Sequence, residues 1–206
     1  MRIGIISTLK DGRWGGCELL WLRAAEYAAT TGDDVAVSLS FGPATVSHTS
    51  GLAANSAALF WRKERDGIVS RQRRKAIVAL RSSKLAPVRC LGCCWRHRRS
   101  ELTRFFAWKP DVVIVNQSNV HDCSNMPDLA FELSMRGVPY VSVVHSASDF
   151  EPPREEEREV ERRFLAGAKA ALFVAVATQR LVERHLACGL PNASIIRNPV
   201  NIEDCS

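Results

Sequence analysis

Short apolar runs alternate with amphipathic segments along most of this chain. Five runs contain few polar residues and predict buried strands, at residues 2–8, 35–39, 112–116, 139–144 and 170–177. Five further segments predict helices, at residues 17–30, 102–108, 127–136, 155–168 and 179–188. Strands that alternate with helices in this way predict one α/β domain, in which a doubly wound, mostly parallel sheet carries helices on both faces.

Turn residues mark the ends of several predicted elements. Three glycines stand where helix C-terminal caps belong: Gly32, Gly137 and Gly189. Thr178 is placed to cap the start of the helix at 179–188, and a last short strand is predicted at 194–197. Residues 41–100 show no comparable order beyond helical spacing in their basic part, so no strand is predicted there.

The composition is that of one ordinary globular domain. With 206 residues, of which 46% are hydrophobic, the chain is long enough to build an apolar core without metals or disulfides. Its longest apolar stretch, 170–177, is far shorter than the roughly 20 residues that span a bilayer. The apolar run after Met1 is too short for a signal peptide, and the 7 cysteines, an odd number, fit reduced thiols. These features predict a cytoplasmic protein.

Positive charge is concentrated in one part of the chain. Residues 61–104 hold 14 of the 28 Lys and Arg but only 3 of the 22 Asp and Glu, so the rest of the chain is acidic although the net charge is +6. Apolar residues at partly helical spacing are interleaved with these charges. The segment is interpreted as a basic, partly helical insertion that either lies against an anionic membrane, on its inner face, or is simply solvated.

Glycines and polar residues follow three predicted strands, where an open parallel sheet binds ligands. The first loop contains Gly15 and Gly16, the second begins at Asn116, and the third runs from His145 to Asp149. Paired glycines let a phosphate or a sugar approach the backbone, and the amides that open the following helix favour an anion. Two simpler interpretations stay open: the glycines make only a tight turn, and the histidine bonds only to backbone at the end of its strand.

Common nucleotide and hydrolase motifs are absent from the sequence. The glycines are spaced Gly12-x-x-Gly15-Gly16, which does not match G-x-G-x-x-G, and Ser38 and Ser40 stand where a dinucleotide site needs an acidic residue. The sequence contains neither a Walker A motif nor a G-x-S-x-G elbow. These observations disfavour dehydrogenases, phosphate-loop enzymes and serine hydrolases.

Several segments taken together resemble a known family. They are, in chain order, residues 15–18, 31–37, 109–113, 138–145, 174–178 and 198–201. In order and spacing they resemble the N-terminal, acceptor-side domain of family-4-like glycosyltransferases with the GT-B architecture, whose sheet is Rossmann-like. The resemblance covers nearly the whole chain apart from about residues 41–100.

The resemblance implies a sugar transfer from a nucleotide-sugar donor to a carbohydrate or lipid-linked acceptor. In such hexosyltransferase-like enzymes the N-terminal domain holds mainly the acceptor, and no metal cofactor is expected. By matched position, Gly15 and Gly16 would lie against the donor diphosphate, and His145 would contact the donor sugar near the reacting carbon. Glu18 matches a common glutamate of the family, but the helix dipole explains an acid at that position equally well. Asn116 and Asp149 are further candidates for substrate binding, as polar residues at strand ends.

The chain departs from the family pattern at its end. The second domain of these enzymes begins just after the segment that residues 198–201 resemble, and it carries a Glu-x7-Glu motif that holds the donor. Two pairs with this spacing occur here, Glu18/Glu26 and Glu151/Glu159, and both are interpreted as helix surface. We therefore expect residues 1–200 to form the acceptor-side domain and 201–206 a truncated interdomain linker. The chain would then be a fragment, a truncated gene product or a subunit that a separate chain completes, and we expect weak or no sugar transfer from this chain alone.

Three other interpretations rest on particular residues. A non-catalytic module could bind anionic lipid or nucleic acid through the basic segment, where Trp61 and Trp95 could stack on bases, although sparse aromatics disfavour nucleic acid. Four residues have the ligand types of a zinc site, but they are crowded within a short loop and are interpreted as incidental: Cys90, Cys93, Cys94 and His97. Cys123 beside His121 suggests a catalytic dyad, which the loop geometry disfavours.

Overall fold

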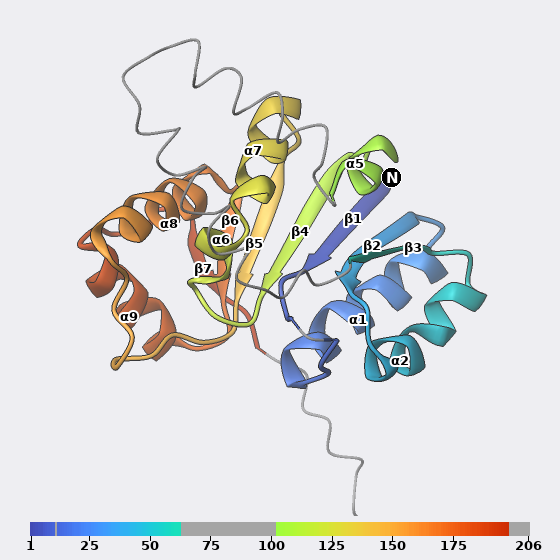
Figure 1. Ribbon diagram of the computed structural model, residues 1–206, viewed down its shortest axis with the longest axis horizontal. Coiled ribbons are helices and arrows are strands. Elements are labelled where there is room, and N and C mark those ends of the chain that lie inside the picture. The colour runs from blue at the N-terminus through green and yellow to red at the C-terminus, as the bar shows by residue number, and fades with distance from the viewer. Residues whose placement is uncertain (11, 63–101, 198–206) are drawn as a thin grey trace, which may run out of the picture.

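The computed structural model describes residues 1–10, 12–62 and 102–197 (Figure 1). Its strands form one sheet in the order β3-β2-β1-β4-β5-β6-β7, and all neighbouring strands run parallel. The strands are β1 (Arg2–Ser7), β2 (Asp34–Ser40), β3 (Ala58–Arg62), β4 (Val112–Gln117), β5 (Tyr140–Val144), β6 (Ala170–Phe173) and β7 (Ala193–Ile195). The α/β, doubly wound, parallel fold that the sequence predicts is confirmed.

Helices pack against both faces of this sheet. They are α1 (Gly16–Thr30), α2 (Pro43–Ala54), α5 (Thr103–Ala107), α6 (Asp122–Asn125), α7 (Pro127–Arg136), α8 (Glu155–Gly167) and α9 (Val176–Leu186). Side chains of α1 and α2 bury one core with β1 and β2, whereas α5, α7, α8 and α9 contribute to the other core. Successive strand residues alternate between the two cores, so Ile5 lies in the first and Ile6 in the second.

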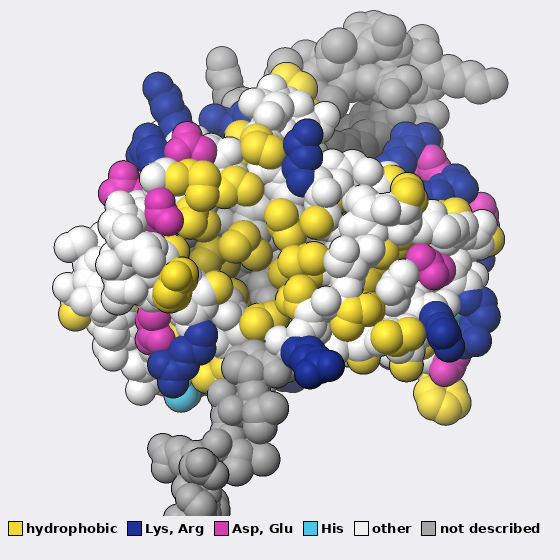
Figure 2. Space-filling view, turned by 180° about the vertical axis from the view of Figure 1, so that it is seen from behind, with side chains coloured by type: hydrophobic (Ala, Val, Ile, Leu, Met, Phe, Trp, Pro, Cys, Tyr) yellow, Lys and Arg dark blue, Asp and Glu magenta, His cyan; other side chains and the backbone are white. Residues whose placement is uncertain are grey.

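Large apolar side chains fill the two cores and hold the helices against the sheet. Trp21 and Leu22 of α1 fill the first core, and Phe105 and Phe106 of α5 are almost completely buried in the second. Each such side chain stabilises the fold by roughly 1.5–3 kcal/mol through the apolar surface that it buries. The sheet is less completely covered over β4 to β6, where Val112, Ile114 and Leu172 alternate with fully buried residues and are only half-buried. Figure 2 shows hydrophobic side chains gathered across the middle of one face of the molecule.

Two elements, α2 and β3, lie where the sequence predicts no order. Helix α2 buries Thr45, Thr49 and Leu52, at intervals of four and three residues. Because two of these three inward positions are threonines, the helix shows little hydrophobic periodicity. Strand β3 is a short edge strand of five residues whose first four side chains are at most half-buried, so its apolar signal is weak.

The start of α9 also differs from the prediction. The apolar run at 170–177 is not one strand: β6 ends at Phe173, and α9 begins at Val176 with Ala175 as its N-cap. Hydrophobicity alone does not separate a buried strand from the first turn of a buried helix. Thr178 therefore lies inside the helix, and the left-handed residue that ends α9 is Ala187, at φ 52°, rather than Gly189.

Several sequence predictions fall outside the described residues. They concern most of the basic segment 61–104, the cysteine and histidine group at 90–97, and the linker at 201–206. None of the helices in the three described ranges is long and apolar enough to span a bilayer.

Candidate functional site

A crevice forms where β1 and β4 lie side by side in the middle of the sheet. From β1 the chain continues to β2 on one side, and from β4 it continues to β5 on the other, so the loops that follow the two strands separate. In doubly wound sheets this switch point, at the carboxyl ends of the strands, is the usual ligand site. The loops that the sequence singles out after β1, β4 and β5 all begin at this edge.

Asn116 connects the three loops by its side chain. It is the penultimate residue of β4 and is fully buried. Its Nδ2 donates to the Cys17 carbonyl at 3.3 Å, in the first turn of α1, and its Oδ1 lies 2.9 Å from Nε2 of His145. The first turn of α1, which begins at the glycine pair, and the histidine that follows β5 therefore lie at the same rim of the sheet, as the sequence predicts, with Asn116 between them.

His145 is held as a neutral imidazole. Burial lowers its pKa to about 4, because a buried site penalises the charged ring. The amide of Asn116 donates to a carbonyl, so its oxygen accepts, and the neutral ring carries its proton on Nε2. Nδ1 then presents a lone pair, which can accept a hydrogen bond from a ligand hydroxyl.

Gly15 and Gly16 open α1 toward unoccupied space. Gly15 is the N-cap, has an extended backbone with φ −146° and makes no side-chain cap. A Cβ at Gly16 would meet no atom within 4 Å, and one at Gly15 would meet only Cys17 Sγ at 3.8 Å. Neither the turn nor the packing requires glycine here, so the tight-turn interpretation loses its physical reason. Glycines at this position leave the first-turn amides accessible to an anion.

Glu18 points into the protein instead of the crevice. Its carboxylate accepts hydrogen bonds from Ser7 Oγ at 2.9 Å and from Trp21 Nε1 at 2.5 Å, and its side chain is almost fully buried. Burial raises the pKa of Glu18, partly offset by these bonds and by the charge of Arg62. Arg62 itself donates to the Ser7 carbonyl. Glu18 thus ties β1 to α1, and its predicted contact with substrate finds no support in this geometry.

Asp149 lies apart from the other predicted site residues. Its carboxylate is exposed and forms an ion pair with Arg184 of α9. Exposed ion pairs of this kind contribute little to stability. Its hydrogen bond leads to α9 and not to Asn116 or His145, so the structure does not bring Asp149 into their network.

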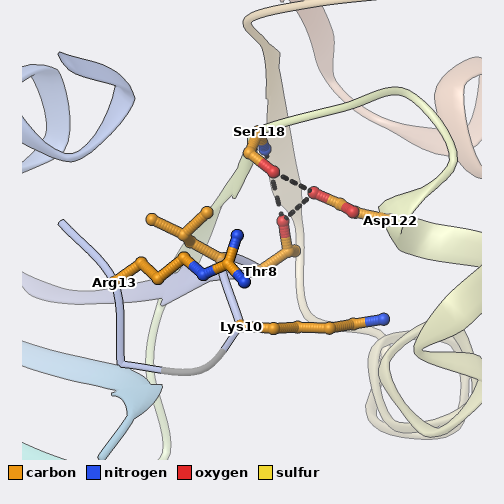
Figure 3. A pocket seen from close by; sticks show the side chains of 6 residues that line it. Thr8, Lys10, Arg13, Ser118 and Asp122 are labelled. Carbon is orange, nitrogen blue, oxygen red and sulfur yellow. Dashed lines mark hydrogen bonds between the residues drawn. The ribbon is translucent and has the colours of Figure 1, made fainter. Parts of the chain in front are cut away.

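A partly open cavity of about 220 Å³ lies in the crevice beside this network (Figure 3). It is lined by Thr8, Leu9, Lys10, Arg13, Ser118 and Asp122. Asp122 Oδ2 accepts hydrogen bonds from Thr8 Oγ1 at 2.6 Å, Ser118 Oγ at 2.8 Å and the Asn119 amide at 3.1 Å. The sequence alone does not single out these residues, although they lie at the ends of the predicted strands at 2–8 and 112–116 or in the loops that follow them. They come together only because β1 and β4 are neighbours in the sheet, which the sequence does not indicate.

His121 and Cys123 do not form a catalytic dyad. His121 Nδ1 lies 2.8 Å from the buried carboxylate of Glu161, which raises the pKa of the imidazole, and Nε2 lies 2.7 Å from the Glu151 carbonyl. The Cys123 thiol is fully buried and donates to the Val120 carbonyl, and burial raises its pKa well above the ordinary range. The structure thus agrees with the sequence in disfavouring nucleophilic catalysis here. Within the described ranges, no three His, Cys, Asp or Glu side chains gather to hold a metal ion.

Comparisons with known proteins find likeness only at the level of structure. No protein-family model matches the sequence, and no curated protein matches it. Solved structures of HepE from Anabaena match 97% of this chain, with TM-scores of 0.55 for the complex with UDP and 0.54 for that with UDP and glucose, each at 15% identity. The complex with UDP-glucose gives 0.54 at 14% identity.

The chain spans less than half the length of these structures, 44–45% of the HepE chain. At such identity the likeness shows the fold alone, a parallel, Rossmann-like α/β sheet, and the GT-B assignment stays a prediction. The narrower family-4 assignment stays a prediction.

Proposed function

We propose that this chain is the acceptor-side part of a nucleotide-sugar-dependent glycosyltransferase, family-4-like within the GT-B architecture. The observation that carries the proposal is the side chain of Asn116, which joins the first turn of α1 to His145 at the switch point. A fold shared with HepE, whose structures hold UDP and UDP-glucose, supports a nucleotide-sugar as the donor.

The glycine pair would serve the leaving diphosphate. Negative charge builds up there as the bond to the sugar breaks, and donors that are already in place stabilise it best. The first-turn amides of α1 and the helix dipole would face this charge, and a helix dipole contributes roughly 0.3–1 kcal/mol near a surface. Gly15 and Gly16 allow the closest approach, because neither has a Cβ.

His145 would orient the donor sugar. Its proton is committed to Asn116 through Nε2, so Nδ1 can only accept a hydrogen bond. A pKa of about 4 keeps the ring neutral at physiological pH, so it adds no positive charge beside a positively charged sugar transition state. Asn116 holds the ring at a fixed angle, which favours one orientation of the bound sugar.

The donor nucleotide would be held mainly by a second domain, in the rest of a longer protein or on a separate chain. One wall of a crevice cannot enclose both substrates, and transfer needs both in register. The 206-residue chain is therefore expected to turn over weakly or not at all by itself. The acceptor would be a carbohydrate or a lipid-linked sugar. A cytoplasmic location on an inner membrane face would suit the basic segment 61–104.

Titration of the ¹⁵N-labelled chain with UDP-glucose, followed by NMR, tests the proposal. Amide shifts are expected at Gly15, Gly16, Cys17 and His145. Gly16→Val should lower the affinity for UDP-glucose at least fivefold, because the valine side chain occupies the space in front of the first turn of α1. Gly51→Val is the matched control, since a Cβ at Gly51 in α2 also meets nothing within 4 Å. Shifts confined to the opposite edge of the sheet, or equal affinities for both variants, would contradict the proposal.

A further inference from the structure

We propose that His121 is a proton-operated clamp on the loop between β5 and α8, residues 145–154. Its doubly protonated ring holds this loop against α8, and loss of one proton releases the outer part of the loop. The clamp stands on contacts within the described chain. Only its consequence for a donor sugar rests on the proposed function, because the loop begins at His145.

Both ring nitrogens of His121 face acceptors. Nδ1 lies 2.8 Å from Oε1 of Glu161 in α8, and Nε2 lies 2.7 Å from the carbonyl oxygen of Glu151 in the loop. An ionised carboxylate and a backbone carbonyl can only accept, so both contacts are hydrogen bonds only when each nitrogen carries a proton. A neutral imidazole has one N–H and leaves one of the two acceptors facing a lone pair.

The buried carboxylate of Glu161 favours the charged ring. Its side chain is 0% exposed, and its second oxygen, Oε2, has no hydrogen-bond partner among the described residues. An isolated buried charge is costly, whereas a charged partner offsets it. Glu161 accordingly raises the pKa of His121 above about 6.5, and Glu157 on the same helix acts in the same direction. On deprotonation the remaining proton stays beside the carboxylate, so the contact that is lost is the one to Glu151.

The other charged groups at this position do not replace the proton on His121. On α9, burial and the charges of His121 and Arg184 lower the pKa of His185, so this ring is neutral where His121 is charged. Arg184 forms an exposed ion pair with Asp149 of the loop. The carboxylate of Asp122, the next residue in the chain, is turned into the cavity wall described above. The charge that changes here above about pH 6.5 is therefore that of His121.

The loop is fixed at its start and held more weakly further out. The His145 amide and the Ser146 hydroxyl donate to carbonyls at and just after the end of β4, at 3.1 and 2.6 Å. From residue 147 to residue 151, two of the described hydrogen bonds reach other elements: the exposed ion pair to α9 and the contact of the Glu151 carbonyl with His121. Exposed ion pairs stabilise little. Once His121 loses its proton, residues 147–151 are therefore free to move while His145 keeps its place.

Release of this loop would loosen one wall of the crevice. Under the proposed function, the loop lies beside the donor sugar that His145 orients. Donor binding would then weaken as the pH rises through the raised pKa of His121. His121 would be a positioning residue, since it acts on the donor only through the loop.

NMR of the full chain, labelled with ¹³C and ¹⁵N, tests the clamp between about pH 5.5 and 9.5. The ring of His121 should titrate above about pH 6.5. The amides of residues 149–151 should shift with the same midpoint, and their heteronuclear NOE values should fall above it. The amides of residues 145–146 are the internal reference and should keep their NOE values. Midpoints of ring and loop that differ by more than about half a pH unit, or loop NOE values that stay constant, would overturn the proposal.

Two variants separate a proton-operated contact from a merely structural one. In Glu161→Gln the counter-charge is lost, so the midpoint of the loop transition should fall by at least about half a pH unit. In His121→Gln the transition should disappear and the loop should be mobile throughout. His185→Gln is the matched control, because it removes a neighbouring imidazole that is already neutral in this range; its transition should stay in place. An unchanged midpoint in Glu161→Gln contradicts the clamp, and this variant decides if circular dichroism shows His121→Gln to be unfolded.

Titration with UDP-glucose at about pH 6 and pH 9 distinguishes the clamp from the proposed function. With both in force, the affinity should be at least threefold lower at the higher pH, and His121→Gln should bind weakly at both. If UDP-glucose fails to bind at either pH while the loop follows the titration of His121, the clamp stands and the proposed function fails. Binding of UDP-glucose without any loop transition overturns the clamp alone.

Discussion

The imidazole of His145 and the side-chain amide of Asn116 are joined by a 2.9 Å contact between Nε2 and Oδ1. Asn116 is the penultimate residue of β4 and His145 follows the neighbouring strand β5, so the two residues are 29 positions apart in the sequence. The same amide reaches the Cys17 carbonyl in α1. Loss of the amide therefore affects three segments at once.

Asn116→Ala is expected to destabilise the protein by about 1–3 kcal/mol, because it empties a fully buried position, takes the acceptor from the His145 N–H and removes the side-chain bond to the Cys17 carbonyl. The measurement is urea unfolding at neutral pH. Asn125→Ala is the control: Asn125 donates to the His121 carbonyl in a half-buried position, and its loss should cost less. Equal losses in the free energy of unfolding for the two variants would contradict a special role of Asn116 in joining these segments.

His145 should make the protein less stable in acid. Its pKa is lowered to about 4 in the folded state and is about 6.5 in an unfolded chain. The unfolded state therefore binds more protons between these values, and stability falls as the pH drops from about 6.5 to about 4. In His145→Gln, whose amide can still donate to Asn116, this part of the decline should disappear. NMR of the ring protons should show no titration of His145 between pH 5 and 8.

His121 should act in the opposite direction. Glu161 raises its pKa in the folded state, so its contribution to stability is complete below about pH 6.5 and is lost as the pH rises through the raised value. Both ring nitrogens lie within hydrogen-bond distance of acceptors, Glu161 and the Glu151 carbonyl, as a doubly protonated ring requires. His121→Gln should flatten the alkaline side of the stability profile and leave the acid side unchanged. A variant profile that parallels the unmodified one would refute this assignment.

Gly12 and Gly16 should respond differently to alanine although they are only four residues apart in the sequence. Gly12 has φ +58°, and a Cβ there would lie 2.4 Å from Gly42 Cα. Gly12→Ala is therefore expected to cost several kcal/mol or to prevent folding, because two backbones must separate. Gly16→Ala should change the free energy of unfolding by no more than about 1 kcal/mol. Thermal unfolding of both variants measures the contrast, and similar melting temperatures would contradict it.

Much of the fold could be predicted because the central strands are continuous apolar runs. β1, β4 and β5 all lie where the sequence places them to within one or two residues. The exceptions are α2, β3 and the start of α9. Threonines face inward in α2, β3 is an edge strand whose side chains are mostly half-buried, and the start of α9 continues the apolar run of β6. Strand order could not be predicted from single segments, because the pairing of β1 with β4, such as Ile3 with Val112 at 109 positions along the chain, depends on the whole sheet.

Part of the candidate site could be predicted because the predicted strands show which residues lie at strand ends. Gly15, Gly16, Asn116 and His145 lie at or after the carboxyl ends of strands, and a parallel sheet brings these carboxyl ends to one edge. Glu18 and Asp149 follow the same rule in sequence, but the first turns inward to Ser7 and the second outward to Arg184. Side-chain direction depends on local packing, which the spacing of residues does not record. Lys10 and Asp122 line the same cavity because β1 and β4 are neighbours in the sheet, and the sequence alone does not show this pairing.

The contact between Gly12 and Gly42 gives the turn after β2 an influence on the cavity. Gly42 packs its backbone against the loop that carries Lys10 and Arg13, and a side chain at either glycine would push that loop away. Phe41 and Gly42 do not line the cavity, yet substitutions at these residues would shift the loop that does and so change which ligands the cavity prefers. Laboratory evolution toward new acceptors would then be expected to select substitutions in this turn as readily as in the cavity.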